Sequence, residues 1–154
     1  MKVLTFSTFI FLFLFNLSSS ALPISNPISP NPQLTPGSVY PTVTVKQLCS
    51  TGYTSTVRSV SASTKKKVFA LYGIDPKLDR YEMDHLISLE LGGNNDIKNL
   101  WPQSMTTQPY NAKKKDILEN KLNDLVCTGK LTIKQSQDEI KLDWIGAYNK
   151  YIKN

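Results

Sequence analysis

The sequence predicts a small α+β domain, because segments with the periodicity of strands and of helices follow one another along it. Residues 82–91 carry Met83, Leu86, Leu89 and Leu91 and lead into turn residues, and we expect a buried strand there that extends into a loop. Residues 111–126 repeat leucine at helical spacing, which is typical of an amphipathic helix. A last helix is expected where Ile140, Trp144 and Tyr148 recur every four residues, with these side chains in the core.

Residues 1–21 have the features of a secretory signal peptide. Lys2 supplies the positive start, Val3–Leu17 is mostly Phe, Leu and Ile, and small residues lead up to Ala21. The apolar run is shorter than the roughly 20 residues of a membrane-spanning helix, so a retained anchor is the weaker alternative. We therefore expect a secreted chain, extracellular or periplasmic, that starts at Leu22 and makes no membrane contact after cleavage.

Residues 22–42 hold six of the nine prolines, among Ser, Asn and Thr. Such a stretch cannot bury enough apolar surface to fold, and it is predicted to be a Pro-rich linker. One folded domain of modest size is then expected over residues 43–154.

Shorter elements are expected before the central strand. Val43–Val45 and Thr56–Val60 have a β-branched bias and predict two short strands. Ser61 or Ser63 can cap a helix over Lys65–Tyr72, which the following glycine ends.

After the central strand, the sequence predicts a hairpin that leads to the long helix. Gly92–Asn95 supplies residues that tolerate a positive φ, as a tight turn requires. Asn99–Trp101 is the expected return strand, and Pro102 is expected to end it. Thr128–Gly129 is expected to end the long helix.

The chain has two cysteines, Cys49 and Cys127. An even number of cysteines in an exported chain predicts a disulfide between them. Closing so long a loop would stabilise the fold by up to about 4 kcal/mol in the chain-entropy account. Two distant cysteines and one histidine do not supply the four ligands of a structural zinc site.

Basic residues exceed acidic ones, and the excess is clustered. Of the 18 Lys and Arg residues, one lies in the signal segment, and the others outnumber the 12 Asp and Glu residues by five. The clusters are Lys65–Lys67 and Lys113–Lys115, and such clusters attract polyanions such as nucleic acid. A solvated cationic face without a partner is the alternative. Lys115 and Asp116 are themselves expected on the solvated surface of their helix.

The only histidine, His85, follows Asp84 within the predicted central strand. An imidazole can accept a proton near neutral pH, and the amides of Asn99 and Asn111 follow downstream. Such a set suits the activation of water beside a metal-bound phosphate. A lone histidine that only packs or caps is the alternative interpretation.

Four elements follow one another here: a strand with Asp-His, a Gly-Gly turn, a strand with Asn-Leu-Trp-Pro, and a helix. This order resembles that of the ββα-metal, or His-Me finger, nucleases. The resemblance covers Arg80 to about Leu122, and it is strongest to HNH-type domains in which the helix residue is Asn. Asn99–Gln103, followed by Asn111 and Glu119, is also similar to the DNA/RNA non-specific endonuclease branch. The resemblance implies that a ββα-metal motif, with further helices and short strands, forms the core of the domain.

The resemblance also implies a role for each motif residue. His85 would be the general base that deprotonates the attacking water, and Asn99 would bind the hairpin backbone or orient His85. Asn111 would be a metal ligand, unless it is only the N-cap of its helix, and Glu119 would hold a metal-bound water. Asp84 matches the ligand that precedes the base in HNH domains but has no counterpart in the non-specific branch, so two ligand models compete.

Oxygen donors of this kind favour Mg²⁺ (or Mn²⁺) over Zn²⁺, because they are hard ligands. The third histidine of many related nucleases is missing here. Arg58, or one of Lys113, Lys114 and Lys115, can pair with the scissile or a flanking phosphate. For Arg58, a surface salt bridge is the alternative.

The sequence therefore predicts a secreted, monomeric, metal-dependent endonuclease that hydrolyses phosphodiester bonds of DNA and/or RNA. Little sequence preference is expected, since no helix-turn-helix, zinc finger or basic zipper is left in the remaining residues. The alternative is a non-catalytic secreted protein that binds nucleic acid or another polyanion on the same scaffold. An inhibitor protein has no signature in the sequence.

Overall fold

The computed structural model of this protein describes residues 28–78 and 80–153, so the predicted signal peptide lies outside the described residues. At the centre lies a two-stranded antiparallel sheet of β1 (Tyr81–His85) and β2 (Leu100–Ser104). The helices are α1 (Val45–Leu48), α2 (Tyr53–Val57), α3 (Ala62–Leu71), α4 (Ala112–Cys127) and α5 (Ile133–Tyr148), with short turns η1 (Leu89–Leu91) and η2 (Ile97–Asn99) and a π-helical end η3 (Asn149–Lys153).

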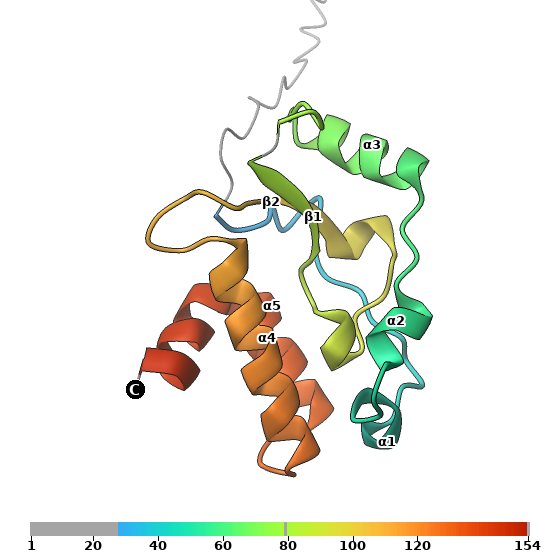
Figure 1. The fold of residues 1–154 in the computed structure, drawn as a ribbon, viewed down its shortest axis with the longest axis vertical. Helices are drawn as coiled ribbons and strands as arrows, with labels where there is room; N and C mark the ends of the chain where they lie inside the picture. The colour runs from blue at the N-terminus through green and yellow to red at the C-terminus, as the bar shows by residue number, and fades with distance from the viewer. Residues whose placement is uncertain (1–27, 79, 154) are drawn as a thin grey trace, which may run out of the picture.

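The predicted class, a small single α+β domain, is confirmed. Figure 1 shows the hairpin at the centre, with α4 and α5 packed together on one side and the segment from α1 to α3 on the other. The core lies between these layers and is formed by side chains of the hairpin and of α3, α4 and α5. In the described part of the chain, no helix is both long and apolar enough to span a membrane.

The register of the hairpin places Asp84 opposite Trp101 and Met83 opposite Pro102. Pro102 was expected to end the return strand, but β2 continues to Ser104. A two-stranded sheet consists of edge strands only, and an edge strand tolerates a residue without an N–H donor. The prediction of a return strand is therefore confirmed, and its predicted end is wrong.

The two long helices form where the leucine and aromatic patterns predict them. α4 follows Asn111, whose side-chain oxygen accepts the backbone N–H of Lys114 at 3.2 Å as an N-cap. α4 ends at Cys127, just before the predicted stop. α5 buries Ile140, Trp144 and Tyr148, as expected.

α5 is interrupted at Asp143, whose φ of −158° and ψ of 84° are not helical. The Asp143 carboxylate accepts the backbone N–H of Gly146 at 3.0 Å, as an N-cap does for a new helix. A Cβ atom on Gly146 would lie 2.4 Å from an Asp143 carboxylate oxygen. The second segment therefore has its own cap, and glycine is the residue that leaves room for it.

The two short strands predicted before the hairpin are wrong, because local hydrogen bonds stabilise helical turns instead. Thr44 and Gln47 form a capping box at the start of α1. In α2 the Thr56 hydroxyl donates to the Tyr53 carbonyl at 2.7 Å, so this β-branched residue is satisfied within a turn. The helix predicted over Lys65–Tyr72 is confirmed as α3, and Ser61 caps it.

The central strand is shorter than predicted. After His85 the chain leaves the sheet, and the Ser88 hydroxyl accepts the N–H of Glu90 at 3.2 Å to start η1. A Cβ atom on Gly93 would lie 1.7 Å from the Ile87 carbonyl oxygen, so the chain can fold back here only with glycine. The loop between the strands therefore has a defined conformation that includes η1 and η2.

Of the linker predicted over residues 22–42, residues 22–27 lie outside the described residues, and residues 28–42 lie on the domain instead. The Trp144 indole N–H donates to the Ile28 carbonyl at 2.9 Å. Thr35 is 1% exposed, and its hydroxyl lies 2.7 Å from the Tyr72 hydroxyl. The prediction failed because prolines disfavour helices and strands without preventing a segment from packing against a neighbouring surface.

The predicted disulfide between Cys49 and Cys127 is confirmed. It joins the residue after α1 to the last residue of α4, across a sequence separation of 78 residues. The α1–α2 segment is thereby fixed to the distal end of the long helix.

Reduction of this disulfide should lower the free energy of unfolding by about 2–4 kcal/mol, because the unfolded chain regains the entropy of a long open loop. Denaturant unfolding of oxidised and reduced protein, followed by circular dichroism, measures the difference. Cys49→Ser with Cys127→Ser should match the reduced protein. Equal unfolding midpoints for all three forms would contradict a stabilising role.

Candidate functional site

β1 presents its side chains alternately to two sides of the hairpin, as a strand does. The Asp84 carboxylate meets the ammonium group of Lys115 on α4. Met83 and His85 line a hollow whose other walls come from residues 58–65. Asp84 and His85 are therefore neighbours in sequence whose side chains have different partners.

Lys115 is fully buried, with 0% of its surface exposed. Its ammonium group lies 2.8 Å from a carboxylate oxygen of Asp84 and donates to the backbone carbonyl of His85 at 2.7 Å. It also forms a short ion pair with Glu119, one helical turn further along α4. The three protons of the ammonium group thus have three acceptors, two of them charged.

The expectation that Lys115 lies on the solvated face of its helix is wrong. Burial alone would lower the pKa of Lys115, but the carboxylates of Asp84 and Glu119 outweigh burial and raise it, so the group stays charged. Lys115 precedes Leu118 and Leu122 on the apolar stripe of α4, and all three are buried. That spacing, with a glutamate four residues later, is the signal that could have revealed a buried ion pair.

His85 is held by Asn95, a residue that was predicted only as part of a turn. The His85 Nε2 atom lies 2.9 Å from the Asn95 side-chain oxygen. The Asn95 amide nitrogen donates to the Val57 carbonyl at 2.7 Å and to the Tyr40 hydroxyl at 3.3 Å. A carbonyl can only accept, so the amide nitrogen must face Val57 and the amide oxygen must face His85.

This arrangement fixes the tautomer of His85. Because the Asn95 oxygen can only accept, Nε2 carries a proton, and in the neutral ring Nδ1 has the free lone pair. Burial lowers the pKa of His85 below its ordinary value, although the hydrogen bond to Asn95 and the charge of Asp84 act in the opposite direction. The imidazole is therefore neutral near pH 7 and able to accept a proton at Nδ1.

Asn99 is fully buried and binds the backbone only. Its side-chain oxygen accepts the N–H of Ile87 at 3.0 Å and of Ser38 at 3.3 Å, and its nitrogen donates to the carbonyls of Ile87 at 3.0 Å and Asn94 at 2.9 Å. Of the two roles considered for Asn99, the structure shows the one that holds the hairpin backbone. His85 is oriented by Asn95 instead.

The three residues predicted to bind a metal ion do not form a ready donor set. The Asn111 oxygen is used as the N-cap of α4, and Asp84 and Glu119 share the ammonium group of Lys115. Over residues 28–78 and 80–153, no three His, Cys, Asp or Glu side chains are grouped so that they could hold a metal ion. The donors as placed do not fit Mg²⁺ or Mn²⁺.

A small acidic hollow of about 120 Å³ lies between β1 and α4. Partial burial of the carboxyl groups raises the pKa of Glu82 and of Asp116, and the nearby charge of Asp84 raises each of them further. Burial also raises the pKa of Glu119, although the Lys115 ammonium acts against it. Asp116 is exposed, as expected.

A larger hollow lies on the other side of His85. It measures about 480 Å³ and is lined by Arg58, Ser59, Val60, Ser61, Thr64, Lys65, Met83 and His85. We call it the α3 groove, because several of its residues belong to the start of α3 or directly precede it. Arg58, Met83 and His85 line both this groove and the acidic hollow.

The other predicted phosphate-binding residues differ in their surroundings. Arg58 is exposed and makes no ion pair with a carboxylate among the described residues, so the salt-bridge alternative is not seen there. Lys113 is exposed. The Lys114 ammonium lies 5.9 Å from the centre of the Tyr148 ring, and thus faces the C-terminal part of the chain.

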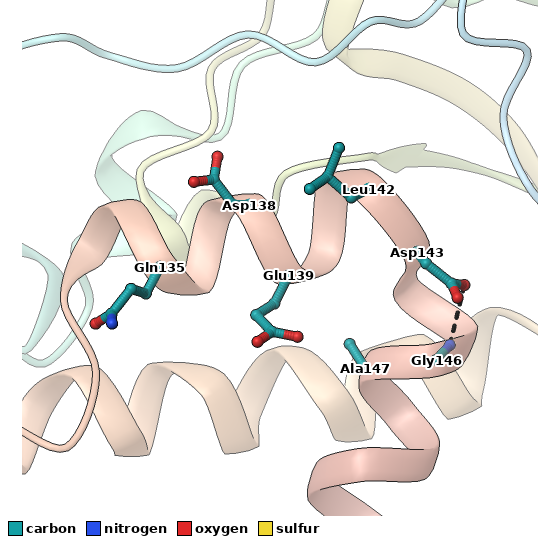
Figure 2. Close-up of a pocket in the computed structure, with 7 residues that line it drawn as sticks. All are labelled: Gln135, Asp138, Glu139, Leu142, Asp143, Gly146 and Ala147. Atoms are coloured by element: carbon teal, nitrogen blue, oxygen red, sulfur yellow. Dashed lines mark hydrogen bonds between the residues drawn. The ribbon is translucent and has the colours of Figure 1, made fainter.

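A further hollow of about 390 Å³ lies on α5 (Figure 2) and is lined by Gln135, Asp138, Glu139, Leu142, Asp143, Gly146 and Ala147. Each of its carboxylates has a partner: Asp138 pairs with Lys134, Glu139 pairs with Lys150, and Asp143 caps the second part of α5. Its lining includes no histidine, cysteine or hydroxyl side chain, and its carboxylates are already used in ion pairs or as a helix cap. We therefore place the candidate site at His85.

Gln103 on β2 is a polar residue for which the sequence predicted no function of its own. It is 1% exposed, and both polar atoms of its amide lack a hydrogen-bond partner among the described residues. It pairs across the hairpin with Glu82 and so lies on the strand face that carries Asp84. A buried amide without partners costs stability, and such groups are worth testing for function.

Comparison with known protein families, with curated proteins and with solved structures finds no match for this chain.

Replacement of Lys115 by Met should destabilise the protein by about 3–5 kcal/mol at pH 7, because the largely buried carboxylates of Asp84 and Glu119 lose their counter-ion. Urea unfolding measures the loss, and Lys113→Met on the exposed face of α4 is the matched control, with little effect expected.

The loss should also depend on pH. Burial already raises the pKa of Glu119 in the folded state, and loss of the opposing ammonium group raises it further above its value in the unfolded state. Stability is then regained as pH falls from neutral toward about 4, since the folded state takes up protons first. A deficit in Lys115→Met that is equal at pH 7 and pH 4.5 would contradict this account.

Proposed function

We propose that this protein is a nucleic-acid phosphodiesterase, an endonuclease in which His85 is the general base. One observation carries the proposal: a buried, neutral imidazole is held through Nε2 by a fixed amide, so that Nδ1 can accept a proton, and it borders a groove that contains two cationic side chains. A histidine that only packs or caps would not need a fixed tautomer beside a cationic groove.

The order of elements supports the resemblance to the ββα-metal nucleases. Asp84 and His85 end β1, a loop with the Gly-Gly segment leads to β2, and α4 follows with Asn111 at its start. The proposal therefore includes the classification of this domain as a His-Me finger.

The proposed reaction is hydrolysis. Nδ1 of His85 takes a proton from a water molecule while the water oxygen bonds to phosphorus. The bond from phosphorus to one ester oxygen breaks, and the released alkoxide takes a proton from solvent. The products are a phosphomonoester and an alcohol, and His85 returns its proton to solvent.

Arg58 would neutralise charge on the phosphate during this step. It lines the groove and the acidic hollow beside His85, and a guanidinium group binds phosphate oxygens in a forked geometry. Whether Mg²⁺ or Mn²⁺ assists is a prediction from the resemblance alone. Secretion likewise remains a proposal, supported by a disulfide that is typical of oxidising compartments.

His85→Ala should reduce cleavage of plasmid DNA or of RNA by about 10²- to 10⁴-fold, because it removes the general base. Cleavage is assayed on gels in EDTA and with added Mg²⁺ or Mn²⁺, and circular dichroism verifies the fold. Activity within about threefold of the native protein would refute the role of His85. If the native protein binds nucleic acid but cleaves neither substrate in any condition, the non-catalytic alternative stands.

The pH dependence of kcat/KM should show an acid limb with its midpoint below the ordinary histidine value of about 6.5, because the base must be neutral. Asn95→Ala removes a hydrogen bond that raises the pKa of His85, so its limb should move to lower pH and its kcat should fall. An acid limb above pH 7, or one that Asn95→Ala leaves in place, would contradict this assignment.

A further inference from the structure

The geometry points to the α3 groove as the place where the phosphate backbone of a polynucleotide binds, with Arg58 and Lys65 as its two cationic contacts. This inference rests on the proposed function and goes beyond it. The substrate is then expected in the α3 groove and not along Lys113–Lys115, the cluster that the sequence places on the same helix as Asn111.

The charges of the two hollows beside His85 indicate which side takes an anion. The lining of the α3 groove includes Arg58, Lys65 and no carboxylate. The hollow on the other side shares Arg58 with the groove, but its lining also includes four carboxylates, of Glu82, Asp84, Asp116 and Glu119. An anionic backbone is therefore attracted into the groove and repelled from the hollow between β1 and α4.

The size and lining of the groove favour phosphate and sugar over bases. Its volume of about 480 Å³ suits a small-molecule unit such as a nucleotide. None of its lining residues is Phe, Tyr or Trp, so the groove lacks the large rings that form a stacking platform for bases. The hydroxyls of Ser61 and Thr64 lie 2.9 Å apart and bond to each other, and Arg58 and Lys65 are the charged donors of the groove.

The lysines of α4 are poorly placed for the same task. Lys115 is buried in ion pairs, and Lys114 lies over the Tyr148 ring. Only Lys113 of that cluster is exposed. His85, by contrast, lies in the wall of the α3 groove itself, so a phosphate held there is beside the proposed base.

Binding of a fluorescent DNA duplex of about 20 bp, measured by anisotropy between about 50 and 200 mM salt, tests the inference. His85→Ala is the background, so that the probe stays intact. The groove variant carries Arg58→Gln and Lys65→Gln. A second variant carries Lys113→Gln and Lys114→Gln, and a third carries Lys46→Gln and Lys130→Gln, which are exposed residues on α1 and after α4.

Each variant loses two positive charges, so only position differs among them. The groove variant should lower the slope of log Kd against log salt by about 1.8, since each lost phosphate contact contributes about 0.9. The other two variants should keep the slope of the background, and all should retain its melting temperature. The effect should be similar on two unrelated sequences, because no base is read.

An unchanged slope in the groove variant would overturn the inference, and so would an equal drop in all three variants. A drop confined to Lys113 and Lys114 would place the backbone along α4 instead. None of these outcomes depends on catalysis. The proposed function fails separately, if the native protein cleaves neither DNA nor RNA.

Discussion

One buried ammonium group holds the hairpin against the long helix. Removing the Lys115 charge from water is costly, and it is offset here by two carboxylates and a backbone carbonyl. Two of these three acceptors, Asp84 and the carbonyl of His85, belong to the end of β1. Because a strand alternates its side chains, tying Asp84 to α4 leaves Met83 and His85 to line the α3 groove, on the side of residues 58–65.

A framework of asparagine amides holds the loop that follows. Asn99 fixes the backbone of the 86–99 loop, and Asn95 binds His85, Val57 and Tyr40. A neutral amide suits the second role, because it orients the imidazole without adding a negative charge beside it. A carboxylate in the same position would raise the pKa of His85 and favour a protonated ring at neutral pH.

The positive charge of the chain is distributed unevenly around this site. Four carboxylates surround the small hollow between β1 and α4, and burial raises the pKa of several of them. The α3 groove, separated from that hollow by Met83 and His85, has only cationic and neutral residues. The net charge of the chain would not predict this separation of charges, because the separation depends on which segments pack against β1.

The sequence by itself determined the α+β class, α3, α4 and α5, and the pairing of the two cysteines. These features depend on short-range periodicity, on helix caps such as Ser61, or on having only one possible partner. Only the tertiary structure decided the burial of Lys115, the role of Asn95 and the docking of residues 28–42. Each of these three features depends on contacts between residues that are distant in sequence, or on burial by neighbouring segments. The indole of Trp144 and the carbonyl of Ile28, for example, are separated by 116 residues, and no local pattern encodes such a contact.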